Sequence, residues 1–162
     1  MRHACFPPVV DDRTETLILG SLPGAASLAA ARYYAHPQNQ FWRLVGAVIG
    51  TDLTTLSYED RLPALLAAGI GLWDVVADAE RAGSLDAAIR DAEPNDLPAL
   101  VRTLPRLRTI AFNGNTAARI GRAQLSDAGA GYRLLALPSS SPAYTLPFAT
   151  KLEAWRKLVP NE

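Results

Sequence analysis

Residues 16–24 read Thr-Leu-Ile-Leu-Gly-Ser-Leu-Pro-Gly, a short apolar run that ends in a glycine- and proline-rich turn. A run of this length is typical of a strand that is buried on both faces, as strands are in a parallel sheet. Gly20, Pro23 and Gly24 favour a tight turn directly after the strand. The stretch therefore predicts the first strand of a parallel sheet and a loop at its carboxyl end.

Three later segments repeat this strand pattern, and helix-like sequence separates them. The predicted strands are residues 16–19, 70–76, 109–112 and 132–137, and the predicted helices are residues 28–33, 41–48, 57–68, 97–104, 116–121 and 148–158. Strands that alternate with helices predict an α/β protein. We expect one domain, residues 1–162, folded as a three-layer α/β/α sandwich around a short four-stranded, mainly parallel sheet.

Two segments give weaker patterns than the rest. Residues 1–13, which contain Pro7-Pro8, predict an irregular amino-terminal arm. Residues 78–89 read as part loop and part helix. Ser27 and Asn95 have the side chains that cap helices and stand just before predicted ones, so both are predicted helix caps.

The composition excludes several classes of protein. Lys plus Arg (16) balance Asp plus Glu (16), which argues against a strongly basic nucleic-acid binder but not against a local phosphate-binding face. Cys5 is the one cysteine, so no disulfide can form within the chain, and the usual Cys/His spacing of a zinc site is absent. No signal peptide or apolar membrane span is visible. We therefore expect a reduced, cytoplasmic protein without a metal, a cofactor or a membrane partner.

In a parallel sheet, the residues that follow the strands converge on one edge, where ligands bind. Here that edge is expected to collect residues 20–24, 73–76, 113–115 and 138–141. Residues 33–42, Tyr-Tyr-Ala-His-Pro-Gln-Asn-Gln-Phe-Trp, follow the first of these segments and combine aromatic rings with side-chain amides. This mixture suits a pocket for a flat ring that forms hydrogen bonds.

Several catalytic arrangements are absent from these segments. Residues 20–24 lack the Lys-Ser/Thr ending of an NTPase phosphate loop and the G-x-G-x-x-G spacing of a dinucleotide site. His36 is the one candidate base and Asp74 the one acid at a predicted strand end, so neither a Ser/His/Asp triad nor paired carboxylates is indicated. Residues 138–142, Pro-Ser-Ser-Ser-Pro, can bind phosphate oxygens or form an ordinary turn. The amide of Asn39 cannot take a proton at neutral pH, but it can hold a water by hydrogen bonds.

Three motifs together resemble those of the uracil-DNA glycosylase superfamily. They are Gly20-Ser21-Leu22-Pro23-Gly24, His36-Pro37-Gln38-Asn39-Gln40-Phe41-Trp42 and Leu137-Pro138-Ser139-Ser140-Ser141-Pro142-Ala143. The middle motif is similar to that of mismatch-specific uracil-DNA glycosylases. The serine motif, with residues 73–75 and 112–114, looks more like the hypoxanthine-DNA glycosylase branch, family six. The resemblance covers residues 14–158. It implies a uracil-DNA glycosylase-like fold and a monofunctional DNA glycosylase that flips out and excises a deaminated base, hypoxanthine first, and leaves an abasic site.

One departure from the mismatch-specific pattern bears on the catalytic residue. Those relatives carry an asparagine at the position of Leu22 that positions the attacking water, and Leu22 cannot do this. The final motif has Ser139 where other branches carry His or Asn. In the hypoxanthine branch the catalytic amide lies in the middle motif, which implies Asn39 here. The alternative role for Asn39 is a helix cap, and one side chain can serve both.

The resemblance also implies which residues meet the base. Gly20, Ser21, Leu22, Tyr34 and Asp74 would bind it, with Tyr34 stacking on the flipped ring. Backbone N–H groups of the glycine turn would meet the negative charge that develops on the departing base. Read without the resemblance, Tyr34 is a core aromatic and Asp74 a capping or turn residue.

A second set is implied to contact DNA: His36, Ser139, Ser140, Ser141, Pro142 and Ala143. The serines would grip the phosphate backbone, and residues 142–144 are candidates to fill the gap left in the base stack. His36 has the alternative role of bracing its loop. Damaged duplex DNA is the expected partner, single-stranded DNA is left open, and a monomer is expected.

Three alternatives to hypoxanthine excision remain at this point. Uracil or xanthine can be the main substrate. Leu22 and the missing amide in the final motif also suit a DNA-lesion-binding module without chemistry. The balanced net charge is compatible with an α/β protein that binds a small molecule. No Lys lies in the three motifs, so Schiff-base lyase chemistry is not predicted.

Overall fold

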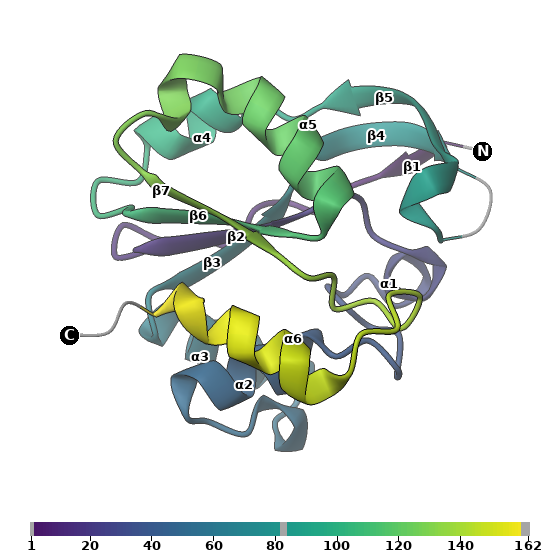
Figure 1. The fold of residues 1–162 in the computed structure, drawn as a ribbon, viewed down its shortest axis with the longest axis vertical. Coiled ribbons are helices and arrows are strands. Elements are labelled where there is room, and N and C mark those ends of the chain that lie inside the picture. Colours follow the sequence, from purple (N-terminus) through teal and green to yellow (C-terminus); the bar gives the residue numbers. More distant parts are fainter. Residues whose placement is uncertain (1, 82–83, 160–162) are drawn as a thin grey trace.

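The computed structural model describes residues 2–81 and 84–159. Its centre is a four-stranded parallel sheet in the order β3-β2-β6-β7 (Figure 1). The strands are β2 (Thr16–Gly20), β3 (Ile70–Asp74), β6 (Thr109–Asn113) and β7 (Arg133–Leu137). This sheet confirms the predicted fold class, and all four predicted strands are present.

Helices cover both faces of the sheet, because side chains alternate between the faces along each strand. Leu17 and Leu19 of β2 pack in the core under α4 and α5, whereas Ile18 packs in the core on the opposite side with α2, α3 and α6. Figure 1 shows these two helical layers above and below the sheet. The helices are α1 (Ala25–Ala30), α2 (Phe41–Ile49), α3 (Tyr58–Ala67), α4 (Leu97–Arg102), α5 (Asn115–Leu125) and α6 (Phe148–Trp155), and the short 3-10 turns are η1 (Leu53–Thr55), η2 (Asp86–Ala88), η3 (Ser126–Gly129) and η4 (Arg156–Leu158).

A second, antiparallel sheet was not predicted. It has the order β1-β4-β5 and consists of β1 (Arg2–Ala4), β4 (Val76–Arg81) and β5 (Ile89–Pro94). The prediction of part loop and part helix for residues 78–89 is therefore wrong at β4, and the arm predicted to be irregular contains a strand. Arg2 joins the three strands, since its guanidinium hydrogen-bonds the carboxylates of Asp78 and Asp91. The β1–β4 pairing thus joins residues more than 70 positions apart, whereas β4 and β5 follow each other in the chain.

Both predicted helix caps are wrong. Ser27 lies inside α1, and its hydroxyl accepts a hydrogen bond from the Ala35 N–H at 3.0 Å. Asn95 is buried, and its amide donates to the Asp74 carbonyl at 2.7 Å, while the neighbouring Asp96 caps α4. Both side chains instead brace segments that lead into the edge described below. No helix among the described residues is long and apolar enough to cross a membrane.

Candidate active site

A cavity of about 440 Å³ opens at the edge of the main sheet where its parallel strands end. Its walls come from the loops after β2 and β7, the last residues of β3 and β6, the segment between α1 and α2, and the segment between β4 and β5. All the residues predicted to bind a base or DNA line it: Gly20, Ser21, Leu22, Tyr34, His36, Asn39, Asp74, Ser139, Ser140, Ser141, Pro142 and Ala143. A cavity of this size, with mixed apolar and polar walls, can hold a flat ligand of drug-like dimensions.

The floor of the cavity is the turn after β2. Gly20 pairs in register with Asp74 of the neighbouring strand, so the two residues lie side by side at the strand ends. A Cβ on Gly20 would lie 2.7 Å from the Asp74 carboxylate oxygen and 2.9 Å from the Tyr34 hydroxyl. The absence of a side chain at Gly20 is therefore what lets these two polar groups approach each other. Leu22, two residues on, is 6% exposed and packs into the core with its aliphatic side chain.

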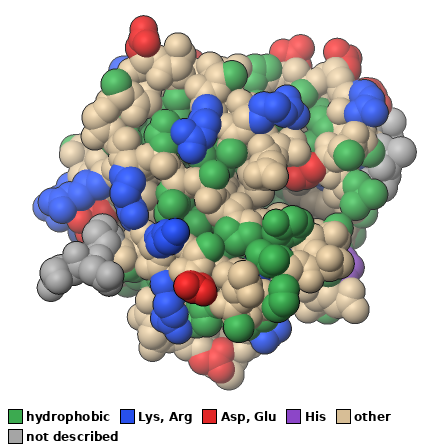
Figure 2. Space-filling view, viewed as in Figure 1, with side chains coloured by type: hydrophobic (Ala, Val, Ile, Leu, Met, Phe, Trp, Pro, Cys, Tyr) green, Lys and Arg blue, Asp and Glu red, His purple; other side chains and the backbone are tan. Residues whose placement is uncertain are grey.

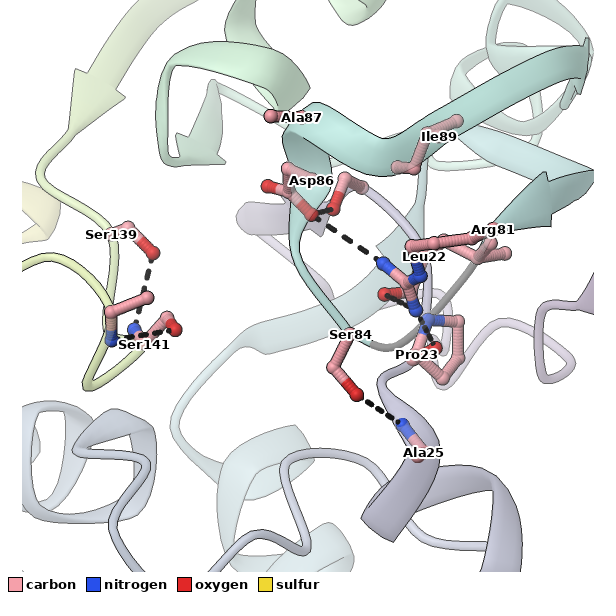
Figure 3. A network of polar contacts seen from close by, with 12 residues as sticks. Leu22, Pro23, Ala25, Arg81, Ser84, Asp86, Ala87, Ile89, Ser139 and Ser141 are labelled. Carbon is pink, nitrogen blue, oxygen red and sulfur yellow. Dashed lines mark hydrogen bonds and ion pairs between the residues drawn. The ribbon is translucent and has the colours of Figure 1, made fainter.

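A polar network that the sequence did not reveal holds this turn in place (Figure 3). The buried Arg81 guanidinium donates to the carbonyl of Pro23, and its Nη1 lies 3.6 Å from the Asp86 carboxylate. Asp86 also accepts a hydrogen bond from the Ser21 hydroxyl at 2.5 Å. Residues 81 and 86 thus connect β4 and η2 to a turn about 60 positions earlier in the chain. No local pattern in the sequence indicates such a connection.

Two exposed apolar side chains stand at the mouth of the cavity. Leu85 is 59% exposed and Tyr144 is 46% exposed, and both line the cavity from different segments. Next to Leu85, the Ser84 hydroxyl accepts a hydrogen bond from the Ala25 N–H at 2.9 Å, which ties this segment to α1 (Figure 3). Tyr144 belongs to residues 142–144, which are predicted to fill the gap in the base stack. Leu85 lies in residues 78–89, which were predicted to be part loop and part helix.

Tyr34 presents an aromatic wall to the cavity. Its ring stacks on Phe41 with the centroids 3.9 Å apart and the planes 16° from parallel, so one face is fixed by packing. Its backbone has a φ of +53°, which is uncommon for a residue with a side chain and costs energy. Phe41 and Trp42 are 0% and 5% exposed and belong to the core that supports this wall.

Asn39 stands one residue before Gln40, the N-cap of α2, and combines a bond to the start of this helix with a position at the cavity. Its side-chain oxygen accepts a hydrogen bond from the Phe41 N–H at 2.9 Å, at the first residue of α2. One lone pair of that oxygen and both amide hydrogens stay available for a further partner. His36 lies three residues earlier, and its Nδ1 accepts from the Gln38 N–H at 3.1 Å, which braces the same loop.

Asp74 is the buried acid of the site. It is 3% exposed, and its Oδ2 has no hydrogen-bond partner among the residues that the structure describes. Burial raises the pKa of the Asp74 carboxyl to about 7, the nearby Asp86 carboxylate adds to the rise, and Arg81 opposes it. A carboxyl group of this kind is neutral in a large share of molecules near pH 7.

The serine loop divides its three hydroxyls between two roles. Ser140 is 1% exposed and exchanges two hydrogen bonds of 2.9 Å with the Asn113 amide, which joins the end of β7 to the end of β6. Ser139 and Ser141 instead accept backbone N–H bonds from residues 141 and 143, so that their own O–H groups stay free to donate. The predicted contact with phosphate therefore falls to these two serines, because Ser140 is turned inward.

Lys151 of α6 lies beneath the serine loop. Its ammonium donates to the Ser141 carbonyl at 3.2 Å and lies 5.5 Å from the centre of the Tyr144 ring. Burial lowers the pKa of Lys151, which is 1% exposed. The sequence motifs contain no lysine, yet the fold brings this one up against the third motif from behind. It adds positive charge under the loop without lining the cavity.

The surface carries no concentrated charge on the face shown in Figure 2, where Lys and Arg side chains are scattered rather than gathered in one patch. Within residues 2–81 and 84–159, no group of three or more His, Cys, Asp and Glu side chains is placed to hold a metal ion. The polar side chains at the cavity are amides, hydroxyls, phenols, carboxyls and the His36 imidazole.

Comparisons with known proteins agree on one family. The family model "Uracil DNA glycosylase superfamily" matches residues 7–159. A protein named hypoxanthine DNA glycosylase from Methanosarcina barkeri is 41% identical over 155 residues, which cover 96% of each chain. A protein of the same name from Methanosarcina acetivorans is 47% identical over 138 residues, 85% of each chain. A solution NMR structure from M. acetivorans, described as a candidate uracil DNA glycosylase, has a TM-score of 0.83 and 42% identity, covering 98% of this chain and 99% of that one.

Proposed function

Because the chain belongs to the uracil DNA glycosylase superfamily, we propose that it is a monofunctional DNA glycosylase that removes hypoxanthine from DNA. Two relatives that match most of its length bear the name hypoxanthine DNA glycosylase. The observation that carries the proposal is the cavity, which gathers a stacking ring, a free amide and a hydroxyl-bearing loop at one edge of the sheet. These are the groups needed to hold a flipped base, a water and a sugar-phosphate backbone.

The base enters the cavity when its nucleotide is flipped out of the duplex. Tyr34, held from behind by Phe41, offers its free face for stacking on the purine. Gly20, Ser21 and Leu22 form the floor, where backbone N–H groups of the turn meet the base. Arg81 holds this turn through the Pro23 carbonyl, so the floor is in place before the base arrives.

The DNA backbone is bound by the loop that follows β7. The free O–H groups of Ser139 and Ser141 donate to phosphate oxygens, and the Lys151 ammonium beneath the loop adds attraction. His36 contacts the backbone from the other wall. Pro142, Ala143 and Tyr144 fill the gap left in the base stack, and the exposed Leu85 contacts the duplex from the opposite side of the mouth.

Bond cleavage follows a dissociative course. The bond between C1′ and N9 breaks, its electron pair leaves with the base, and positive charge develops on the sugar. The Asn39 side chain holds a water at C1′ through the hydrogen-bonding capacity that its capping bond to Phe41 leaves free. The water adds to C1′ and gives up a proton, which neutralises the departed base. The products are free hypoxanthine and an abasic site.

Leu22 stands where mismatch-specific relatives place the water-binding asparagine, and it is buried and aliphatic. The usual route to uracil excision is therefore not open to this chain. A panel of duplexes that contain inosine, uracil or xanthine tests the proposal, with release of the free base measured under excess enzyme. We expect hypoxanthine release to be fastest, and faster release of uracil would contradict the assignment.

We also infer that the protein works as a cytoplasmic monomer. Its single Cys5 suits a reducing compartment, and one cavity can hold one flipped nucleotide without a second copy of the chain. Sedimentation of the protein alone and with a lesion-bearing duplex tests this, and a dimer on one lesion would contradict it.

A further inference from the structure

Asp74 places a carboxyl group in the wall of the cavity that holds the base. The residue ends β3, lines the cavity and is 3% exposed. Its Oδ2 is buried and has no hydrogen-bond partner within the described part of the chain. Buried polar atoms of folded proteins are nearly always paired, so an unpaired one at a binding site indicates a partner that arrives with the ligand.

A second polar group points to the same place. The Tyr34 hydroxyl is also buried, and among the described residues the Asn113 amide lies near it without a hydrogen bond of normal geometry. A Cβ on Gly20 would lie within 3 Å of both this hydroxyl and the Asp74 Oδ1, so the two groups converge over the bare Cα of Gly20. The wall of the cavity is therefore polar at one spot, and no described residue pairs with the Asp74 Oδ2 there.

The charges around Asp74 determine its protonation. The Arg81 guanidinium is directed to Asp86 and to the carbonyl of Pro23, and no ion pair between Arg81 and Asp74 is found in the described structure. Burial, and after it the Asp86 carboxylate, raise the pKa of Asp74 to about 7, against the opposing effect of Arg81. The other titratable groups nearby are the phenols of Tyr33 and Tyr34 and the thiol of Cys5; burial raises the pKa of each, and the charge of Asp74 adds to the rise.

The chemistry of the proposed reaction requires a donor at this position. As the bond to C1′ breaks, the electron pair moves onto the purine, and negative charge spreads over its ring nitrogens and O6. An ionised carboxylate against the ring would repel this charge, whereas a carboxylic acid would stabilise it by donating a hydrogen bond. A desolvated cavity strengthens both effects, because little water screens the charges.

We propose that Asp74 acts as a neutral carboxylic acid whose O–H group donates a hydrogen bond to the departing base and so stabilises its negative charge. The inference rests on the proposed function and assigns a catalytic role to a residue of the same site. Asp74 keeps its proton during bond cleavage, and the base takes its proton from the attacking water. Asp74 is accordingly neither the nucleophile nor the base that activates water, and the water stays with Asn39.

The test is the pH dependence of hypoxanthine release under single-turnover conditions between pH 5.5 and 8.5. We expect the wild-type rate to be level at low pH and to fall by about tenfold per pH unit well above pH 7, as Asp74 ionises. Asp74→Asn keeps an N–H donor of the same shape but cannot ionise, so its rate should stay level across the range. Asp74→Leu keeps the size but removes the donor, and its rate should fall about 100-fold or more.

Asp86→Asn is the matched control, because it makes the same chemical change at the neighbouring carboxylate. Removal of that negative charge lowers the pKa of Asp74, so the alkaline fall should persist and move to lower pH. Thermal unfolding shows whether the Asp74 variants are folded. If they fold poorly, the measurement on Asp86→Asn still tests the proposal. If the alkaline fall in the rate of Asp86→Asn stays at the wild-type pH or moves to a higher pH, the proposal is contradicted.

Two further outcomes separate the inference from the proposed function. If the wild type releases no hypoxanthine at any pH, the proposed function fails and the inference fails with it. If the wild type releases hypoxanthine but Asp74→Asn keeps the alkaline fall, or is folded and inactive at every pH, only the role of Asp74 is overturned.

Discussion

Gly20→Ala is expected to disable the cavity while leaving the sheet folded. The added methyl group would lie 2.7 Å from the Asp74 Oδ1 and 2.9 Å from the Tyr34 hydroxyl, both shorter than the 3.4 Å at which ordinary contact begins. Neither group can yield freely, because Asp74 belongs to a sheet strand and the Tyr34 ring is stacked on Phe41. Both polar groups must therefore move away from the position at which they meet the base.

The size of the effect follows from this geometry. Forcing one extra methyl group into a packed site costs about 1–3 kcal/mol of unfolding free energy, which a domain of ordinary stability survives. A catalytic group displaced by about 1 Å can cost roughly 100-fold in rate. Since contacts of 2.7 and 2.9 Å must open to about 3.4 Å, each group moves by more than a few tenths of an ångström, and we expect kcat/KM for hypoxanthine release to fall by about 10- to 100-fold.

Urea unfolding and single-turnover excision, measured on the same preparation, separate the two effects. Gly129→Ala is the matched control, because its added methyl group would meet Leu125 at 3.4 Å and Leu134 at 3.5 Å, which is ordinary contact, far from the cavity. We expect this control to keep wild-type excision and to change stability by less than about 1 kcal/mol. A Gly20→Ala protein with wild-type stability and excision would refute the close convergence of Asp74 and Tyr34.

Three further predictions follow from the same structure. Asn113→Ala removes two 2.9 Å hydrogen bonds to the buried Ser140 and should lower the unfolding free energy by about 1–3 kcal/mol in urea titrations. An unchanged midpoint of urea unfolding would contradict the role of Asn113 in joining the ends of β6 and β7. Because the pKa of Asp74 is raised from its usual 3.8 to about 7, its contribution to stability is fully present below pH 4 and is lost as the pH rises through 7. The loss is on the order of 4 kcal/mol, and Asp74→Asn should abolish this slope in unfolding measured from pH 4 to 8. Ser139→Ala and Ser141→Ala should each weaken binding of a lesion-bearing duplex by about tenfold in titrations, with little change in excision under saturating enzyme; an equal loss at Ser140→Ala without loss of stability would contradict the division of roles.

The main sheet could be predicted because its signals are local. Residues 16–20 are apolar on both faces, and the glycine turn that follows can only end the strand. The antiparallel sheet could not be predicted in the same way. β5 reads Ile-Arg-Asp-Ala-Glu-Pro and is almost wholly exposed, so neither hydrophobic alternation nor β-propensity distinguishes it from a loop. It pairs with β4, its neighbour in the chain, and the exposed contact of Asp91 with Arg2 comes from far away in sequence.

In the site, too, residues with a local sequence signal could be predicted, and residues that act through distant contacts could not. Tyr34, Asn39 and Asp74 stand in motifs or at a strand end, and the fold brings them to one cavity as the sequence indicated. Arg81 and Lys151 carry no local signal. Arg81 binds the Pro23 carbonyl, which lies far earlier in the chain, and Lys151 binds the Ser141 carbonyl in the loop before α6. Such contacts become visible once the packing of the elements is known.

The central claim is that Asn39 positions the water and does not only cap α2, and comparison of two variants tests it most directly. Asn39→Ala loses both the capping bond to the Phe41 N–H and the amide, whereas Asn39→Ser keeps a hydroxyl that can cap but removes the amide. We predict that hypoxanthine release under single-turnover conditions falls at least about 100-fold in both variants, while the stability of Asn39→Ser stays within about 1 kcal/mol of the wild type. Excision by Asn39→Ser at the wild-type rate would contradict the claim and leave Asn39 as a helix cap.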